Sequence, residues 1–378
     1  MESNKKAHAL LSSSSSSRWI NCNPSARLTE HMPDVSSDYS REGSTAHLAC
    51  EIKLSKALGY EPDEPNLFDH VDPEIDECSN AYVSYIMEIV EDLKANNKEP
   101  FVLVEQKLDY SKYVEEGFGT GDCIIVSDGL INIVDYKHGR GIKIESENNP
   151  QMMIYALGAL ELFKDLYDIE KVVMTIYQPR LSNISTFEMS VEDLLKWANE
   201  VLVPAAKLAY KGEGQYSCGE WCTFCKAKHT CRERAKLNTQ LAQMEFKEPP
   251  LLTDEEIVEI LHKVDGLVSW ANDIKDYAFQ EAIKGKKWDG FKLVEGRATR
   301  KYSDEGLVAE EVLKAGFDPY DKKVVGITEM QKRLGKSKFL EIVNQYVIKP
   351  AGKPTLVLES DKRPEFNTAI ADFMTTEE

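Results

Sequence analysis

Two runs of apolar residues on either side of an Asp-Gly pair form the clearest pattern in the chain. Residues 124–126 precede the pair Asp128–Gly129, and residues 131–134 follow it. An Asp-Gly pair between two apolar runs is typical of a β-hairpin. The pattern therefore predicts two antiparallel strands, over residues 121–127 and 130–137.

The remaining hydrophobic pattern predicts a helical region, an α/β region and a second helical region. The first has helices near 12–20, 41–58 and 74–95, joined by a Pro/Asp-rich loop at 61–73. The second adds strands at 101–108 and 170–178, helices at 150–163 and 190–210, and a cysteine-bearing loop and helix at 216–245. The third region follows a linker at 247–250. It begins with a capping box at 253–256, which starts a long helix to about residue 285. A β segment at 288–302 and helices at 304–315 and 327–346 come after it. We expect an α/β (α+β) protein with a mixed central sheet flanked by helices.

These regions predict three parts. Residues 1–11 are expected to be disordered, residues 12–246 to form the core domain, and residues 250–378 to form a mostly helical accessory domain. The apolar runs are too short to cross a bilayer, and no signal-peptide core is present. We therefore expect a cytoplasmic protein.

Three charged residues stand at the ends of the predicted hairpin. Asp122 opens its first strand, and Asp135 and Lys137 close the second. In an antiparallel pair these ends meet at one edge, and residues two apart point to the same face. Two carboxylates hold Mg²⁺ or Mn²⁺ beside a phosphate, and an amine orients the attacking water. The alternative is a solvated hairpin end that carries surface charges.

Further polar residues accompany this hairpin in a fixed order. His47, with Glu51 one helical turn later, precedes the strands, and Glu105 lies in the strand before the hairpin. Gln151 and Tyr155 follow it on one helix face. With Gly119–Asp122 and Asp135–Lys137, this order resembles the RecB-like branch of the PD-(D/E)XK nucleases, over residues 12–236.

The resemblance implies a restriction-endonuclease-like core and metal-dependent DNA hydrolysis, which we expect to be exonucleolytic. Asp122, Asp135, the carbonyl of Tyr136 and His47 would bind the cation, and imidazole favours Mn²⁺ over Mg²⁺. Lys137 would position the water, while Gln151 and Tyr155 would orient Lys137 or contact DNA. Glu105 would be an outer or second-metal carboxylate. Two alternatives stay open: His47 paired with Glu51, and a catalytically silent DNA-end-binding scaffold.

Cysteine spacing gives a second signal. The chain has 8 cysteines, and Cys222, Cys225 and Cys231 are close enough in sequence to hold a metal in a reducing compartment. A subset of RecB-like nucleases has a [4Fe–4S] cluster with one distant N-terminal cysteine, which here would be Cys22. Cys218 is a rival fourth ligand, and zinc is an alternative to the cluster. The cluster would staple the N-terminal segment to the end of the core.

The net charge of −18 means that DNA binding requires local cations. We expect phosphate contacts from two groups beside the candidate metal sites: Arg140 and Lys143, and Lys226, Lys228, Arg232 and Arg234. Residues 250–378 resemble the tail of a phage- and prophage-associated RecB-like family. Expected partners are therefore DNA and phage replication or recombination proteins, such as a single-strand-binding protein, in a bacterial host cytoplasm.

Overall fold

The computed structural model of the protein describes residues 9–33, 38–62, 72–96, 98–242, 253–294, 302–320, 324–348 and 361. They belong to two compact units, Met1–Gln280 and Glu281–Glu378. The predicted disordered residues 1–8, the linker at 247–250 and much of the loop at 61–73 lie outside the described residues.

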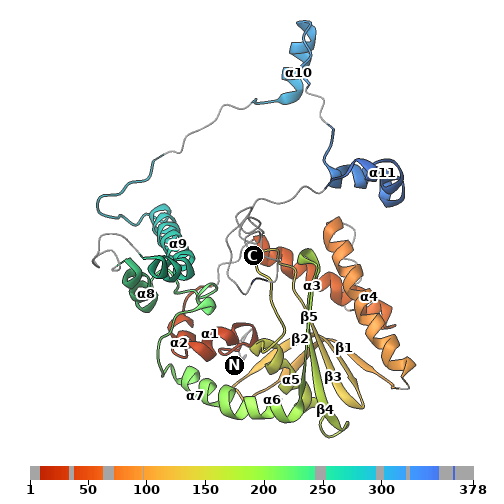
Figure 1. The fold of residues 1–378 in the computed structure, drawn as a ribbon, viewed down its shortest axis with the longest axis vertical. Coiled ribbons are helices and arrows are strands. Elements are labelled where there is room, and N and C mark those ends of the chain that lie inside the picture. Colours follow the sequence, from red (N-terminus) through yellow and green to blue (C-terminus); the bar gives the residue numbers. More distant parts are fainter. Residues whose placement is uncertain are drawn as a thin grey trace, which may run out of the picture. The chain divides into compact units, whose positions relative to one another are not determined.

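The first unit contains one five-stranded sheet among its described residues (Figure 1). Its strands are β1 (Phe101–Asp109), β2 (Phe118–Ser127), β3 (Gly129–Tyr136), β4 (Ile169–Gln178) and β5 (Asn183–Ser190). The helices before it are η1 (Ser13–Ser15), α1 (Ser16–Asn21), α2 (Ser25–Thr29), α3 (Asp38–Ala57) and α4 (Pro73–Ala95). The later ones are α5 (Pro150–Phe163), η3 (Pro179–Leu181), α6 (Val191–Trp197), η4 (Ala198–Leu202), α7 (Val203–Lys211), η5 (Glu220–Cys222), α8 (Arg232–Ala242) and α9 (Asp254–Ile283).

The strands follow their sequence order across the sheet, β1-β2-β3-β4-β5. All neighbours are antiparallel except β3 and β4, which are parallel and are joined through α5. A parallel pair needs such a crossover connection because its strands start at the same end. The expected mixed central sheet flanked by helices is confirmed.

The predicted β2–β3 hairpin is present as an antiparallel pair. Cys123 pairs with Val134, and Val126 pairs with Ile131. Gly129 adopts a positive φ of 78° at the turn, which glycine tolerates because it has no Cβ. The ends that carry Asp122 and Asp135 therefore lie side by side.

Both faces of the sheet are covered. Ile124, Ile133 and other alternate residues pack in a core with α1, α5, α6 and α7, while Ile125 and Val134 pack on α3 and α4. In Figure 1, α3 and α4 lie on one side of the strands and α5 and α6 on the other. Strands buried on both faces read as continuous apolar runs, which explains the apolar hairpin.

Several elements differ from the predictions. Strand β5 was not expected, and the helix predicted at 190–210 is divided by the π-helical turn η4. The predicted disorder of residues 1–11 is wrong for its last part, because Leu11 is fully buried in the core. The β segment expected at 288–302 is not a strand over residues 288–294, and residues 295–301 lie outside the described chain.

The second unit is helical in its described part. It contains α10 (Glu305–Lys314), α11 (Ile327–Ile342) and η7 (Asn344–Tyr346), with a kink in α11 at Gly335.

The capping box that was predicted to start the long helix is present at the start of α9. Thr253 Oγ1 accepts a hydrogen bond from the Glu256 amide, and the Glu256 carboxylate accepts one from the Thr253 amide. In the described part of the chain, no helix is long and apolar enough to span a membrane.

Candidate metal centre

The regular β2–β3 pairing stops at Cys123, and the side chain of Asp122 continues it. Oδ2 of Asp122 accepts a 2.7 Å hydrogen bond from the backbone amide of Tyr136. Oδ1 lies 3.4 Å from Nδ1 of His47, on helix α3. Asp122 therefore links the β2–β3 hairpin to α3, and it places His47 at the same edge of the sheet as the end of β3.

Glu105 completes a group of potential metal ligands. Its backbone has a positive φ of 47° within β1, and the regular β1–β2 pairing skips the Glu105–Asp122 position. Ligand atoms of His47, Glu105 and Asp122 all lie within 4.8 Å of one another. A positive φ is costly for a non-glycine residue and is concentrated at functional sites. The break in β1 therefore places a third ligand beside the two from α3 and β2.

Asp135 and Lys137 lie at the end of β3, beside this group. Nζ of Lys137 is 2.8 Å from Oδ2 of Asp135. Oδ1 of Asp135 accepts a 3.1 Å hydrogen bond from Nε2 of Gln151. Asp135 is only 2% exposed, so its charge depends on these neighbours. Gln151 thus contacts Asp135 rather than Lys137 in this structure.

Tyr155 supports Gln151 from the next turn of α5, with its hydroxyl 3.4 Å from Nε2. Its ring lies against Gly119, where a Cβ would be 3.2 Å from both Tyr155 and Ser13. A side chain at this position would push the ring away. Gly119 therefore lets the N-terminal segment and α5 pack close to the strand that carries Asp122.

The acidic groups change one another's pKa. Burial and then the Asp122 carboxylate raise the pKa of Glu105 to about 8. Burial and Asp122 also raise the pKa of Asp135, against the opposing effect of Lys137. Burial acts to lower the pKa values of His47 and Lys137, but Asp122 and Asp135 outweigh it and raise both. Negative charge on Asp122 and Asp135 therefore dominates the electrostatics of this site, which favours a bound cation.

Four cysteines line one pocket in the first unit. Cys22, from the turn after α1, faces it together with Cys222, Cys225 and Cys231. Cys218 is not among the lining residues, but burial and then the neighbouring Cys222 and Cys231 raise its pKa to about 12. Both proposed fourth ligands thus lie near the cysteine loop, and Cys22 is the one that faces the pocket.

Comparison of the sequence with family models gives one match, to the family described as "Protein of unknown function (DUF2800)", over residues 8–364. The chain belongs to the DUF2800 family. A similar solved structure, titled "Crystal structure of SSO0001", is 17% identical and covers 51% of this chain and 98% of its own. The TM-score of 0.23 does not establish a shared fold.

The basic residues expected to contact DNA are largely paired with carboxylates in this DUF2800 chain. Lys143 lies 2.6 Å from Glu145, and Arg140 pairs with Glu74. Lys228 and Arg234 both contact Asp273 of α9, at 2.8 Å and 2.5 Å.

Arg234 differs most from the expectation. It is only 7% exposed because it is packed between α8 and α9, so it is a structural residue rather than a surface cation. Lys226 is half-buried and donates to the carbonyl of Met32, whereas Arg232 is exposed.

The sequence predicted Glu105 as an outer or second-metal carboxylate, and it did not identify Glu42, Glu74 or the position of Arg180 between them. An acidic residue inside a strand was the available signal for Glu105. No pattern in the sequence marks the other three residues.

Proposed function

We propose that the protein is a divalent-metal-dependent deoxyribonuclease of the RecB-like PD-(D/E)XK type. The observation that carries this proposal is the meeting of His47, Glu105 and Asp122 within 4.8 Å, beside the Asp135–Lys137 pair. Oxygen ligands with one imidazole suit Mn²⁺ or Mg²⁺. Such a cation polarises a phosphodiester and lowers the pKa of bound water.

The residues present fit such a cation. Asp135 is almost fully buried, with Nζ of Lys137 2.8 Å from Oδ2 as its charged partner. A buried carboxylate that also lies near the carboxylates of Asp122 and Glu105 is costly without further positive charge, and a divalent cation would supply it. His47, Asp122, Asp135 and the carbonyl of Tyr136 are the proposed ligands, and Glu105 is added to them as a further carboxylate.

Lys137 and Gln151 act on the reacting groups in different ways. Against the effect of burial, the carboxylates of Asp135 and Asp122 favour the protonated amine of Lys137 and raise its pKa. A protonated amine would donate to the attacking water or to a phosphate oxygen. Gln151 holds Asp135 in place through its hydrogen bond, and Tyr155 holds Gln151. These two residues would therefore position a metal ligand.

We assign the cysteine pocket to an iron–sulfur cluster that ties the N-terminal segment to the end of the core. Cys22, Cys222, Cys225 and Cys231 line the same pocket, and four thiolates would hold either a [4Fe–4S] cluster or Zn²⁺. Metal analysis and a visible spectrum separate the two, because the cluster absorbs visible light and zinc does not.

The test is digestion of end-labelled linear and circular DNA with Mn²⁺, by wild type, Asp135→Ala and Lys137→Ala. We expect the wild type to cleave linear DNA from its ends. Cleavage should fall by more than ~100-fold in both variants, because Asp135→Ala removes a metal ligand and Lys137→Ala removes a positively charged hydrogen-bond donor. Asp109→Asn, which changes an exposed carboxylate that caps Ser111, is the matched control.

Retained activity in either site variant would contradict the assigned site. DNA binding without cleavage by wild type would favour the alternative, a silent end-binding scaffold. Association with phage replication proteins in a bacterial host is also part of this proposal, and it follows from the family resemblance alone.

A further inference from the structure

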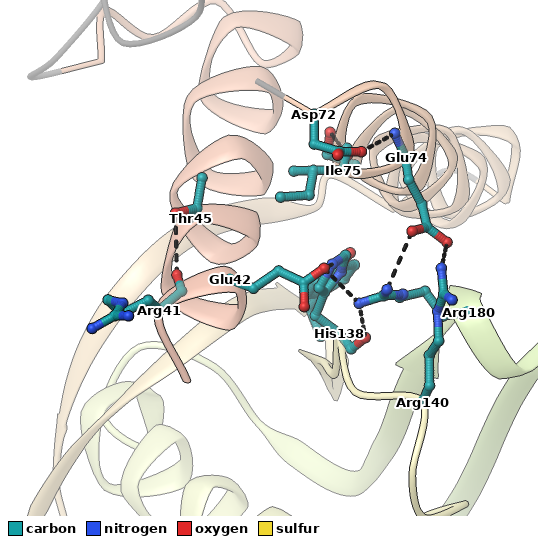
Figure 2. Close-up of polar contacts among 11 residues, drawn as sticks. Arg41, Glu42, Thr45, Asp72, Glu74, Ile75, His138, Arg140 and Arg180 are labelled. Atoms are coloured by element: carbon teal, nitrogen blue, oxygen red, sulfur yellow. Dashed lines mark hydrogen bonds and ion pairs between the residues drawn. The ribbon is translucent and has the colours of Figure 1, made fainter. Parts of the chain in front are cut away.

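A second polar cluster lies next to the metal centre, where α3, α4 and the ends of β3 and β4 meet (Figure 2). Nη2 of Arg180, from η3, is 3.2 Å from Oε2 of Glu74, and Arg140 pairs with Oε1 of the same carboxylate. The carboxylate of Glu74, at the start of α4, is therefore held between two guanidinium groups of the same chain. Two guanidinium groups that converge on one oxyanion would hold a phosphate in the same place.

The cluster is built into the protein and adjoins the catalytic strand end. The Arg180 side chain is only 10% exposed, and its Nη1 donates to Glu42 at 3.0 Å and to the carbonyl of His138, the residue after Lys137. Nε of Arg180 is buried and has no partner within the described chain. Arg180 is thus fixed in place with unused donor capacity.

The opposite side of the cluster is open to solvent. The Arg140 side chain is 59% exposed and that of Glu74 is 41% exposed. An anion from solution can therefore reach the position that the Glu74 carboxylate occupies, whereas Arg180 stays anchored behind it through Glu42. The exchange would need only a rotation of two exposed side chains.

We infer that Arg140 and Arg180 form a phosphate-binding site for the nucleic-acid backbone, for which the Glu74 carboxylate is an internal competitor. This inference rests on the proposed function, since it names how the same site holds its substrate. It also explains how a chain of net charge −18 keeps two arginines beside its catalytic centre: both pair with Glu74, which a phosphate would replace.

The test measures binding of a fluorescein-labelled DNA duplex in EDTA, where cleavage is prevented, over a range of salt concentrations. Glu74→Gln frees both arginines without removing the side chain. It should bind roughly three- to tenfold more tightly, with a salt dependence steeper by about one phosphate contact, a slope change of ~0.9. Glu74→Gln/Arg140→Gln should lose this gain.

Asp76→Asn is the matched control, because Asp76 lies in the same first turn of α4 but pairs with Lys53 outside the cluster. It should bind as wild type does. Equal affinity of Glu74→Gln and Asp76→Asn, in proteins that unfold at the same temperature, overturns the inference, as does a gain that survives Arg140→Gln.

A competition with inorganic phosphate separates a backbone site from a general anion site. If inorganic phosphate binds Glu74→Gln but does not compete with the duplex at unchanged ionic strength, the site recognises free phosphate alone and the backbone assignment is wrong. Because binding is read without metal, the result is independent of cleavage. If the wild type cleaves DNA but Glu74→Gln binds the duplex no more tightly, only this inference is wrong. If Glu74→Gln binds more tightly but the wild type does not cleave DNA, only the proposed nuclease function is wrong.

Discussion

Oδ2 of Asp122 accepts a 2.7 Å hydrogen bond from the backbone amide of Tyr136. One carboxylate oxygen therefore extends the β2–β3 pairing, and the other is left for the candidate cation. The hydrogen bond needs only an acceptor oxygen, whereas a cation ligand also needs negative charge. An asparagine amide in its place would keep the hydrogen bond but bind a cation poorly, because it has an acceptor oxygen and no charge.

We therefore expect Asp122→Asn and Asp122→Ala to differ in stability but not in activity. Both should lose Mn²⁺-dependent cleavage. Asp122→Ala also leaves the Tyr136 amide without its partner, which costs about 1–3 kcal/mol. Urea unfolding of the two variants measures the difference, and equal midpoints would show that the hydrogen bond contributes nothing to the fold.

The pocket geometry predicts which cysteine is the fourth ligand. Cys22→Ser should lower iron content, visible absorbance and thermal stability as much as Cys225→Ser does, since both residues line the pocket. Cys218→Ser should be nearly silent. The opposite ranking would mean that all four ligands come from residues 218–231 and that the N-terminal segment is held by packing alone.

Glu161 should make stability depend on pH. Burial opposes its ionisation, but hydrogen bonds from Lys112, Lys164 and Tyr113 outweigh burial and hold its pKa at about 2, below the ordinary 4.5. A carboxyl whose folded pKa is lowered contributes stability above pH 4.5, and that stability is lost as pH falls towards 2. Glu161→Gln should therefore flatten the fall in unfolding free energy between these values, measured with urea, whereas an unchanged slope would contradict the assigned contacts.

The Arg234–Asp273 pair should act on folding rather than on DNA. Arg234→Glu buries two carboxylates together and should destabilise the α8–α9 pairing, by about 3–5 kcal/mol if the pair is treated as buried. Arg234→Glu/Asp273→Arg should recover much of this loss. By contrast, Arg232→Glu changes an exposed residue and should weaken DNA binding at unchanged stability. Weaker DNA binding by Arg234→Glu in a protein of unchanged stability would restore the phosphate role.

The sequence predicted those parts of the fold that depend on local pattern. The β2–β3 hairpin follows from its apolar runs and its Asp-Gly turn, and α5 begins at Pro150 with Asn149 as its cap, a recognisable start. Strand β5 was missed because it is an edge strand, with only Phe187 and Met189 among its inward residues as large apolar side chains.

The site was predictable only where residues are neighbours in sequence or on a regular element. Asp135 and Lys137 share a face because they are two apart in a strand. Glu105 reaches His47 and Asp122 through an irregular backbone conformation, which alternation cannot reveal. Arg234 was taken for a surface cation because its burial depends on α9, a helix that comes later in the chain.

The N-terminal segment packs on parts of the protein that are synthesised much later. Trp19 and Leu11 belong to the core that contains α5 and α7, and Cys22 shares its pocket with Cys231. These first residues are synthesised well before their partners, and contacts so distant in sequence form slowly. The apolar surface of Leu11 and Trp19 therefore stays uncovered until α7 has been synthesised, so this part of the core closes late in folding.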